Sequence, residues 1–206
     1  MSYFDLLLAD NVARLLRDIL AGCYFYIHFG IPCSSFSVIQ NLNQGTRSIE
    51  NPSGDGSLER ELVGNKFADT VSMLCNALQE VGAFYSLENP RSSYLWRYSP
   101  ISKLLDHAVD VDFDQCAYGL APPGVICKKS DSCSRIKKPT RVRTNLLQLQ
   151  HLARKWSCAH KHFTCLGSVK VDGSWVSVAK EAGKYPLKLC DEWASLVSLA
   201  VSETRP

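Results

Sequence analysis

Cys33 stands in the stretch HFGIPCSSFSVI, directly after Pro32 and before the hydroxyl side chains of Ser34, Ser35 and Ser37. The thiolate is the nucleophilic form of cysteine, and a nearby cation or backbone amide that lowers the thiol pKa from about 8.5 would make it reactive. The preceding run, CYFYI, is aromatic and β-branched, which is typical of a buried strand. Cys33 is therefore a candidate nucleophile at the end of a strand.

Two further polar clusters adjoin predicted strands. Glu88 and Asn89 follow the run GAFYSL, and Arg141 and Arg143 adjoin a later short strand. Parallel strands present the loops at their carboxyl ends along one edge of the sheet. We therefore expect a thiol, a carboxylate and guanidinium groups to share one crevice.

Another group of residues, near the C-terminal end of the sequence, has the chemistry of metal ligands. The stretch WSCAHKHFTC holds Cys158, His160, His162 and Cys165. Sulfur and imidazole suit tetrahedral zinc, but these intervals match none of the common zinc knuckles. Buried thiols beside exposed histidines are the simpler interpretation. If zinc binds, the predicted ligands are Cys158, His162 and Cys165, in a structural site.

The elements that must position these residues follow from the apolar pattern. Helices are expected over 11–22, 58–82, 99–108, 145–156 and 185–201, and strands over 23–29, 82–90, 109–119 and 141–145. This alternation predicts an α/β fold with a mainly parallel sheet, helices on both faces and the site at the carboxyl ends of the strands. Residues 40–57 are rich in turn formers and predict a long loop, either functional or disordered, directly after the Pro-Cys motif.

The composition bounds the class of protein. The chain has 206 residues, 46% of them hydrophobic and 21% charged, which suits one globular domain. No apolar run approaches the roughly 20 residues of a membrane helix, and the N-terminus lacks the basic region of a signal peptide. Nine cysteines without an export signal predict an intracellular, reducing compartment, the nucleus or the cytoplasm.

The charge is distributed unevenly. The net charge of +3 does not by itself imply a nucleic acid, but residues 128–143 hold seven Lys and Arg against a single acid, Asp131. Such a local positive patch suits a phosphate backbone. A solvated basic loop explains the same run equally well.

The order of these motifs resembles a known family. A strand ending in Pro-Cys-x-x-Phe-Ser, a strand ending in Glu-Asn, a Tyr-Gly and an Arg-x-Arg occur in this order in the DNA (cytosine-5) methyltransferases. The variant with ENP, then CAYG at 116–119 and KPTRVRTN at 138–145, is similar to divergent methylase-like proteins of phages and mobile elements. The resemblance covers about residues 23–145, and each motif alone is short and unspecific.

The resemblance implies a partial Rossmann-like methyltransferase sheet, DNA as partner and S-adenosylmethionine as cofactor. In the family the cysteine attacks C6 of a flipped-out cytosine, the glutamate binds the base, and the arginines orient the base and the thiolate. These roles fall on Cys33, Glu88, Arg141 and Arg143. The implied substrate-binding residues are Pro32, Ser37, Asn89, Lys138 and Thr140.

The chain also departs from the family pattern. The family opens with a Phe-x-Gly-x-Gly turn that holds the cofactor, whereas the first glycine here is Gly22, only eleven residues before Cys33. No residue can therefore be assigned to the cofactor. The expectation is a single methyltransferase-like domain over 1–206, with a catalytic half at about 23–145 and a Cys/His-containing, helical segment at 146–206. A second chain would supply the cofactor-binding half.

Three alternatives stay open at the level of the sequence. The chain is also interpretable as an inactive methyltransferase-like remnant of a mobile element that binds nucleic acid. A cysteine hydrolase would pair Cys33 with His28 or His107. A zinc-dependent nucleic-acid-binding module would use the Cys/His segment instead.

Overall fold

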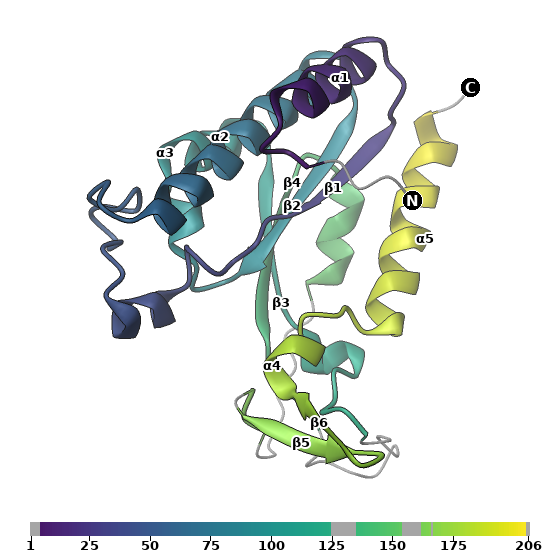
Figure 1. The fold of residues 1–206 in the computed structure, drawn as a ribbon. Helices are drawn as coiled ribbons and strands as arrows, with labels where there is room; N and C mark the ends of the chain where they lie inside the picture. The colour runs from purple at the N-terminus through teal and green to yellow at the C-terminus, as the bar shows by residue number, and fades with distance from the viewer. Residues whose placement is uncertain (1–4, 125–134, 154–161, 166, 205–206) are drawn as a thin grey trace. The chain divides into compact units, whose positions relative to one another are not determined.

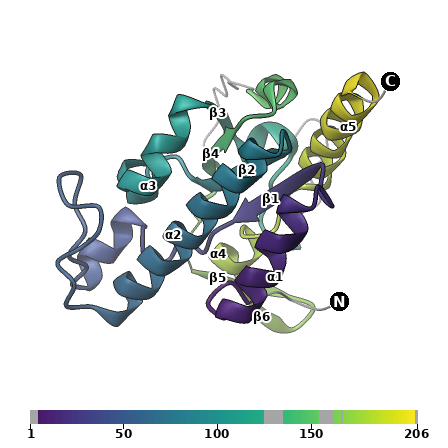
Figure 2. The same cartoon turned by 90° about the horizontal axis from the view of Figure 1, so that it is seen from above.

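A computed structural model gives the fold and describes residues 5–124, 135–153, 162–165 and 167–204 (Figure 1, Figure 2). The helices and strands are, in chain order, α1 (Ala9–Leu20), β1 (Tyr26–Gly30), α2 (Glu59–Glu80), β2 (Phe84–Pro90), α3 (Ser99–Ser102), β3 (Val109–Asp114), β4 (Pro139–Thr144), β5 (Ser168–Val171), β6 (Ser174–Ser177), α4 (Val178–Glu181) and α5 (Leu187–Thr204). Short 3₁₀ helices lie at Val38–Asn43, Tyr94–Arg97, Lys103–Asp106, Gln115–Tyr118 and Leu147–Leu152. No helix in these described ranges has the length and apolar character needed to cross a membrane.

Four strands form one sheet in the order β1–β2–β4–β3, and β5 pairs with β6 in a separate hairpin. The predicted α/β class is confirmed. The prediction of a mainly parallel, partial Rossmann-like sheet is wrong, because only β1 and β2 are parallel and the other neighbouring pairs are antiparallel. Parallel neighbours need a long crossover, usually a helix. The helix α2 supplies one between β1 and β2, whereas the described part of the β3–β4 connection contains only the 3₁₀ helix Gln115–Tyr118.

The chain divides into two compact units. The first comprises Met1–Asp110 and Arg141–Leu147, and the second comprises Val111–Thr140 and Gln148–Pro206. The Pro-Cys and Glu-Asn motifs and both predicted catalytic arginines belong to the first unit. The metal-ligand candidates belong to the second.

The core of the first unit lies between the sheet and the helices α1 and α2, which lie side by side over β1 and β2 in Figure 2. Ile19 of α1 and Leu74 of α2 are fully buried there with Leu87 of β2. The apolar residues that predict the helix at 58–82 include Leu62, but Leu62 is 45% exposed while its neighbour Glu61 is buried.

The second unit has a smaller core and a hairpin that the sequence analysis missed. Leu120, Ile136, Val178 and Ala182 form the buried cluster. The expected helix at 145–156 is reduced in its described part to the 3₁₀ helix Leu147–Leu152. The hairpin β5–β6 turns at 172–173, where both residues have positive φ, the backbone that a two-residue hairpin loop requires.

Candidate active site

The carboxyl ends of β1 and β2 bring the Pro-Cys and Glu-Asn motifs to the same edge of the sheet. In the parallel register Gly30 pairs with Glu88, and Cys33 follows Gly30 by three residues. The side-chain amide of Asn89 donates a hydrogen bond to the carbonyl of Ile31 at 3.0 Å. Asn89 is fully buried, so this bond fixes the start of the Pro-Cys turn against the end of β2.

Cys33 lies on an exposed turn whose continuation is anchored. The side chains of Pro32, Cys33 and Ser34 are exposed, whereas Phe36 is fully buried in the core. The backbone N–H of Tyr94 donates to the Phe36 carbonyl at 3.0 Å. The turn is therefore held on both sides, and it presents the thiol to solvent.

Ser37, a predicted substrate-binding residue, begins the 3₁₀ helix that follows. Its hydroxyl accepts the backbone N–H of Ile39 at 3.4 Å. Ile39 and Leu42 of this helix are 57% and 85% exposed. The segment after the thiol therefore projects apolar side chains into solvent.

The rest of the 40–57 loop is fastened to α2 by a buried arginine. The Arg47 guanidinium donates from Nη1 to Asn65 Oδ1 and from Nη2 to the Glu61 carbonyl, both at 2.9 Å, and lies 3.7 Å from the centre of the Phe36 ring. Burial lowers the pKa of Arg47, and the Glu61 carboxylate opposes that effect. The Glu61 carboxylate also accepts the backbone N–H of Thr46 at 2.9 Å. These hydrogen bonds hold the loop against α2. In the sequence, the feature that could have indicated this contact is Glu61, an acidic residue on an otherwise apolar face of the helix.

Glu88 lies on the face of β2 that points away from the core. Alternate residues of a strand point to opposite faces, and those flanking Ser86 on β2 belong to the core, so Ser86 and Glu88 share the other face. The Ser86 hydroxyl contacts the Tyr26 hydroxyl and lies 2.7 Å from His28 Nδ1. Burial lowers the pKa of His28 to about 4, so its imidazole is neutral at pH 7 and is a weak general base.

The two predicted catalytic arginines both bind Asp110, a residue that the sequence analysis did not single out. Arg143 is 1% exposed, donates from Nε and Nη2 to the two carboxylate oxygens at 2.7 and 2.9 Å, and donates from Nη1 to the Ile101 carbonyl at 2.8 Å. Arg141 is more exposed and places Nη1 3.1 Å from the same carboxylate. Both guanidinium groups lie over the ring of Trp96, at 5.9 Å for Arg141 and 5.2 Å for Arg143.

Both arginines lie by Trp96, whose Nε1 donates to the Pro90 carbonyl at the carboxyl end of β2. Trp96 and Ile101 belong to the core of the first unit. Along the strand, the backbone N–H of Tyr85 donates to Asn145 Oδ1, so the end of β4 meets the start of β2. Because the two strands are antiparallel, Arg141 lies toward the carboxyl end of β2.

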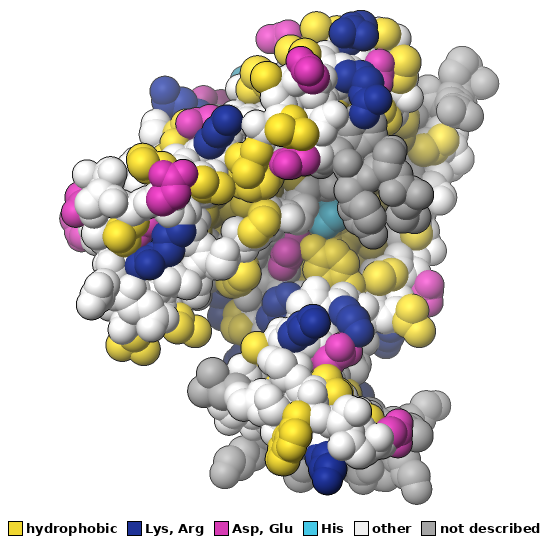
Figure 3. All heavy atoms as spheres, in the orientation of Figure 1, with side chains coloured by type: hydrophobic (Ala, Val, Ile, Leu, Met, Phe, Trp, Pro, Cys, Tyr) yellow, Lys and Arg dark blue, Asp and Glu magenta, His cyan; other side chains and the backbone are white. Residues whose placement is uncertain are grey.

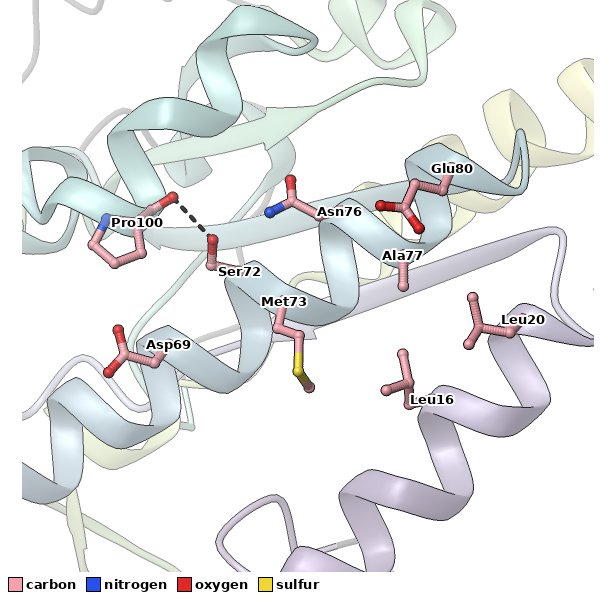
Figure 4. A pocket seen from close by; sticks show the side chains of 9 residues that line it. All are labelled: Leu16, Leu20, Asp69, Ser72, Met73, Asn76, Ala77, Glu80 and Pro100. Atoms are coloured by element: carbon pink, nitrogen blue, oxygen red, sulfur yellow. Dashed lines mark hydrogen bonds between the residues drawn. The ribbon is translucent and has the colours of Figure 1, made fainter.

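Two cavities of the first unit lie near these elements. A small one of about 150 Å³ lies beside the Pro-Cys motif and is lined by Leu6, His28, Phe29, Gly30, Ile31, Pro32, Phe67 and Val71. A larger crevice of about 500 Å³ lies between α1 and α2 (Figure 4). Leu16 of α1 and Met73 of α2 face each other across it, and Ser72 donates to the Pro100 carbonyl at its edge. Neither Cys33 nor Glu88 lines the crevice.

The predicted substrate-binding residues Lys138 and Thr140 belong to the second unit. Thr140 is fully buried, and its hydroxyl accepts Nε2 of Gln115 at 3.0 Å. The Lys138 ammonium lies 6.0 Å from the centre of the Tyr185 ring. These contacts are structural, and a role in binding a base stays a prediction.

The zinc prediction falls partly outside the described residues, because Cys158 is not among them. Cys165 is half-buried against the core cluster of the second unit. Burial raises the pKa of the Cys165 thiol, and Lys138 opposes that effect. Within the described ranges no group of three or more His, Cys, Asp or Glu side chains could hold a metal ion. The zinc site stays a prediction.

Comparisons of this chain with models of protein families, with curated proteins and with solved structures found no match.

Proposed function

We propose that this chain is a divergent DNA (cytosine-5) methyltransferase-like protein in which Cys33 is the nucleophile. The observation that carries the proposal is the parallel register of β1 and β2, in which Gly30 pairs with Glu88 and Asn89 binds the Ile31 carbonyl. Two separate motifs of the resemblance thus lie at neighbouring strand ends, with the thiol exposed.

The proposed chemistry needs a cytosine that has left the duplex. The Cys33 thiolate forms a bond to C6, the C5=C6 electron pair shifts to C4=C5, and the C4=N3 pair moves to N3. N3 takes a proton from the carboxyl group of Glu88. C5 is then nucleophilic, and it accepts a proton from water when no other electrophile is present. The hydroxide left by that water takes a proton from C5, the thiolate leaves C6 as the C5=C6 bond re-forms, and N3 returns its proton to the Glu88 carboxylate, which restores cytosine.

S-adenosylmethionine is the methyl donor that the resemblance implies, but the described residues do not fit it. The cavity beside Pro32 holds about 150 Å³, whereas small-molecule sites usually enclose at least about 300 Å³. The larger crevice is lined by residues of α1 and α2 with Pro100, away from Cys33. We derive no methyl-transfer step from this chain, and we propose that a second chain supplies the donor-binding half.

A second candidate is an inactive methyltransferase-like remnant of a mobile element that binds nucleic acid. The geometry of Arg143 favours it, because this arginine is committed to Asp110 and to the Ile101 carbonyl instead of being free to orient a base. The described cysteines form no disulfide bond, and we propose a reducing, intracellular compartment for either candidate.

Exchange of the C5 hydrogen of cytosine in DNA separates the two candidates without a methyl donor. The Cys33 thiolate adds to C6, C5 takes a proton from solvent, and the thiolate is then eliminated. This cycle replaces a tritium label at C5 with solvent hydrogen. Release of tritium that depends on Cys33 supports the nucleophile. Binding of DNA without release supports the remnant.

A further inference from the structure

The hairpin β5–β6 has two different faces. In its antiparallel register Val169 pairs with Val176 and Lys170 pairs with Trp175, so successive pairs point to opposite sides. Val169 and Val176 are half-buried, and Val169 packs against the core cluster of the second unit. The other face carries Lys170 and Trp175, both exposed.

Trp175 is unusual among the described tryptophans. Its side chain is 73% exposed, whereas Trp96 and Trp193 are 5% and 8% exposed. Indole is large and apolar, and a structural tryptophan normally buries most of its surface. Strand β6 thus holds an indole in solvent, directly across from Lys170 of β5.

The positive charge at the exposed hairpin face is local. The described residues of the second unit hold 7 Lys and Arg and 7 Asp and Glu, and Lys170 is the cation on this face. Figure 3 shows basic, acidic and apolar side chains exposed around α4 and the hairpin. Lys170 also lines a groove of about 640 Å³ together with Pro123 and Phe163. An unpaired base and the phosphate beside it complement the exposed pair of Trp175 and Lys170.

We propose that the exposed hairpin face binds single-stranded DNA, with one base stacked on the indole of Trp175 and an adjacent phosphate paired with the Lys170 ammonium. A duplex keeps its bases stacked inside, so an exposed indole can stack only on an unpaired base. The groove along β5 then offers a path for the neighbouring nucleotides. The inference rests on the proposed function for its partner, DNA, but it requires neither Cys33 nor methyl transfer.

Fluorescence anisotropy of labelled oligothymidylate, with the full chain, tests the inference. Trp175→Ala should weaken binding roughly ten-fold or more, and Trp175→Phe should stay within about three-fold of the original chain, because a phenyl ring still stacks. Lys170→Ala should reduce the slope of log affinity against log salt by about one, whereas Lys180→Ala, which removes an exposed lysine of α4, should change affinity less. Oligothymidylate should also quench the tryptophan emission of the original chain.

Three results would overturn the inference. The first is that the original chain and Trp175→Ala bind oligothymidylate equally well. The second is that the chain binds duplex DNA more tightly than single-stranded DNA. The third is that the chain binds anionic vesicles through Trp175 but does not bind the oligonucleotide. Circular dichroism of each variant excludes loss of fold as the cause of weaker binding. Oligothymidylate contains no cytosine, so binding through Trp175 supports this inference even if Cys33 never exchanges hydrogen at C5.

Discussion

The side-chain amide of Asn89 donates a 3.0 Å hydrogen bond to the carbonyl of Ile31, and so joins the end of β2 to the residue two positions before Cys33. We expect Asn89→Ala to cost about 1–2 kcal/mol of unfolding free energy, because it removes this bond and leaves a buried carbonyl unpaired. Asn89→Ala should also slow the C5 exchange that depends on Cys33 by more than the fraction of unfolded chain explains, because the turn that carries Cys33 loses its anchor. Urea unfolding and C5 exchange measured on the same variant check this. Unchanged stability would contradict the anchoring role.

The two arginines of β4 should differ sharply in their contribution to stability. Arg143→Ala leaves the Asp110 carboxylate without its bidentate partner, and we expect a loss of about 3 kcal/mol. Arg141→Ala removes a more exposed contact to the same carboxylate and should cost less than about 1 kcal/mol. Chemical denaturation measures both. Equal losses, or a larger loss for Arg141→Ala, would show that Arg143 is not the structural member of the pair.

His28 should make folding weaken in acid. Its pKa is lowered from 6.5 to about 4 by burial, so the unfolded chain binds the proton first as the pH falls. The contribution of the neutral His28 to the free energy of unfolding is complete above pH 6.5 and is lost as the pH falls toward 4. The free energy of unfolding should therefore fall by about 2 kcal/mol between pH 7 and pH 5. His28→Gln should remove this component. Urea unfolding at the two pH values compares the variant with the original chain, and an identical pH dependence would refute the assignment.

Arg47 should determine how firmly the loop after the thiol is held. Arg47→Met deletes a buried guanidinium bound to Asn65 and to the Glu61 carbonyl, so amide hydrogen exchange over residues 44–57 should become faster. Arg60→Met is the matched control, because Arg60 is exposed and donates to the Asn43 carbonyl at 2.7 Å. Mass spectrometry of exchanged peptides reads both variants. Similar exchange in the two would mean that the buried network does not hold the loop.

Part of this site could be predicted from the sequence, but the direction of β4 and the partner of Arg143 could not. The adjacency of the carboxyl ends of β1 and β2 was predictable, because a β-rich run, a long helix and a second β-rich run indicate a parallel pair. The direction of β4 was not, since it depends on how the chain returns from β3. The partner of Arg143 could not be identified either, because Asp110 lies far away in sequence on another strand.

Local patterns misled in two other places. Leu62 fits an apolar helical repeat but is exposed, whereas Glu61 is buried because Thr46 and Arg47 bind it. Tertiary contacts decide which of two neighbouring residues faces inward. The turn at 172–173 is an Asp-Gly pair, a strong hairpin signal that could have revealed β5 and β6.

Exchange of tritium from C5 of cytosine in DNA tests the central claim most directly. The original chain should release the label, and Cys33→Ala should reduce release to that of DNA alone, because addition at C6 is what makes C5 exchangeable. Cys23→Ala is the matched control, since Cys23 is also an exposed free thiol but precedes β1, and it should release the label like the original chain. No release by the original chain, or equal release after Cys33→Ala, would contradict the account.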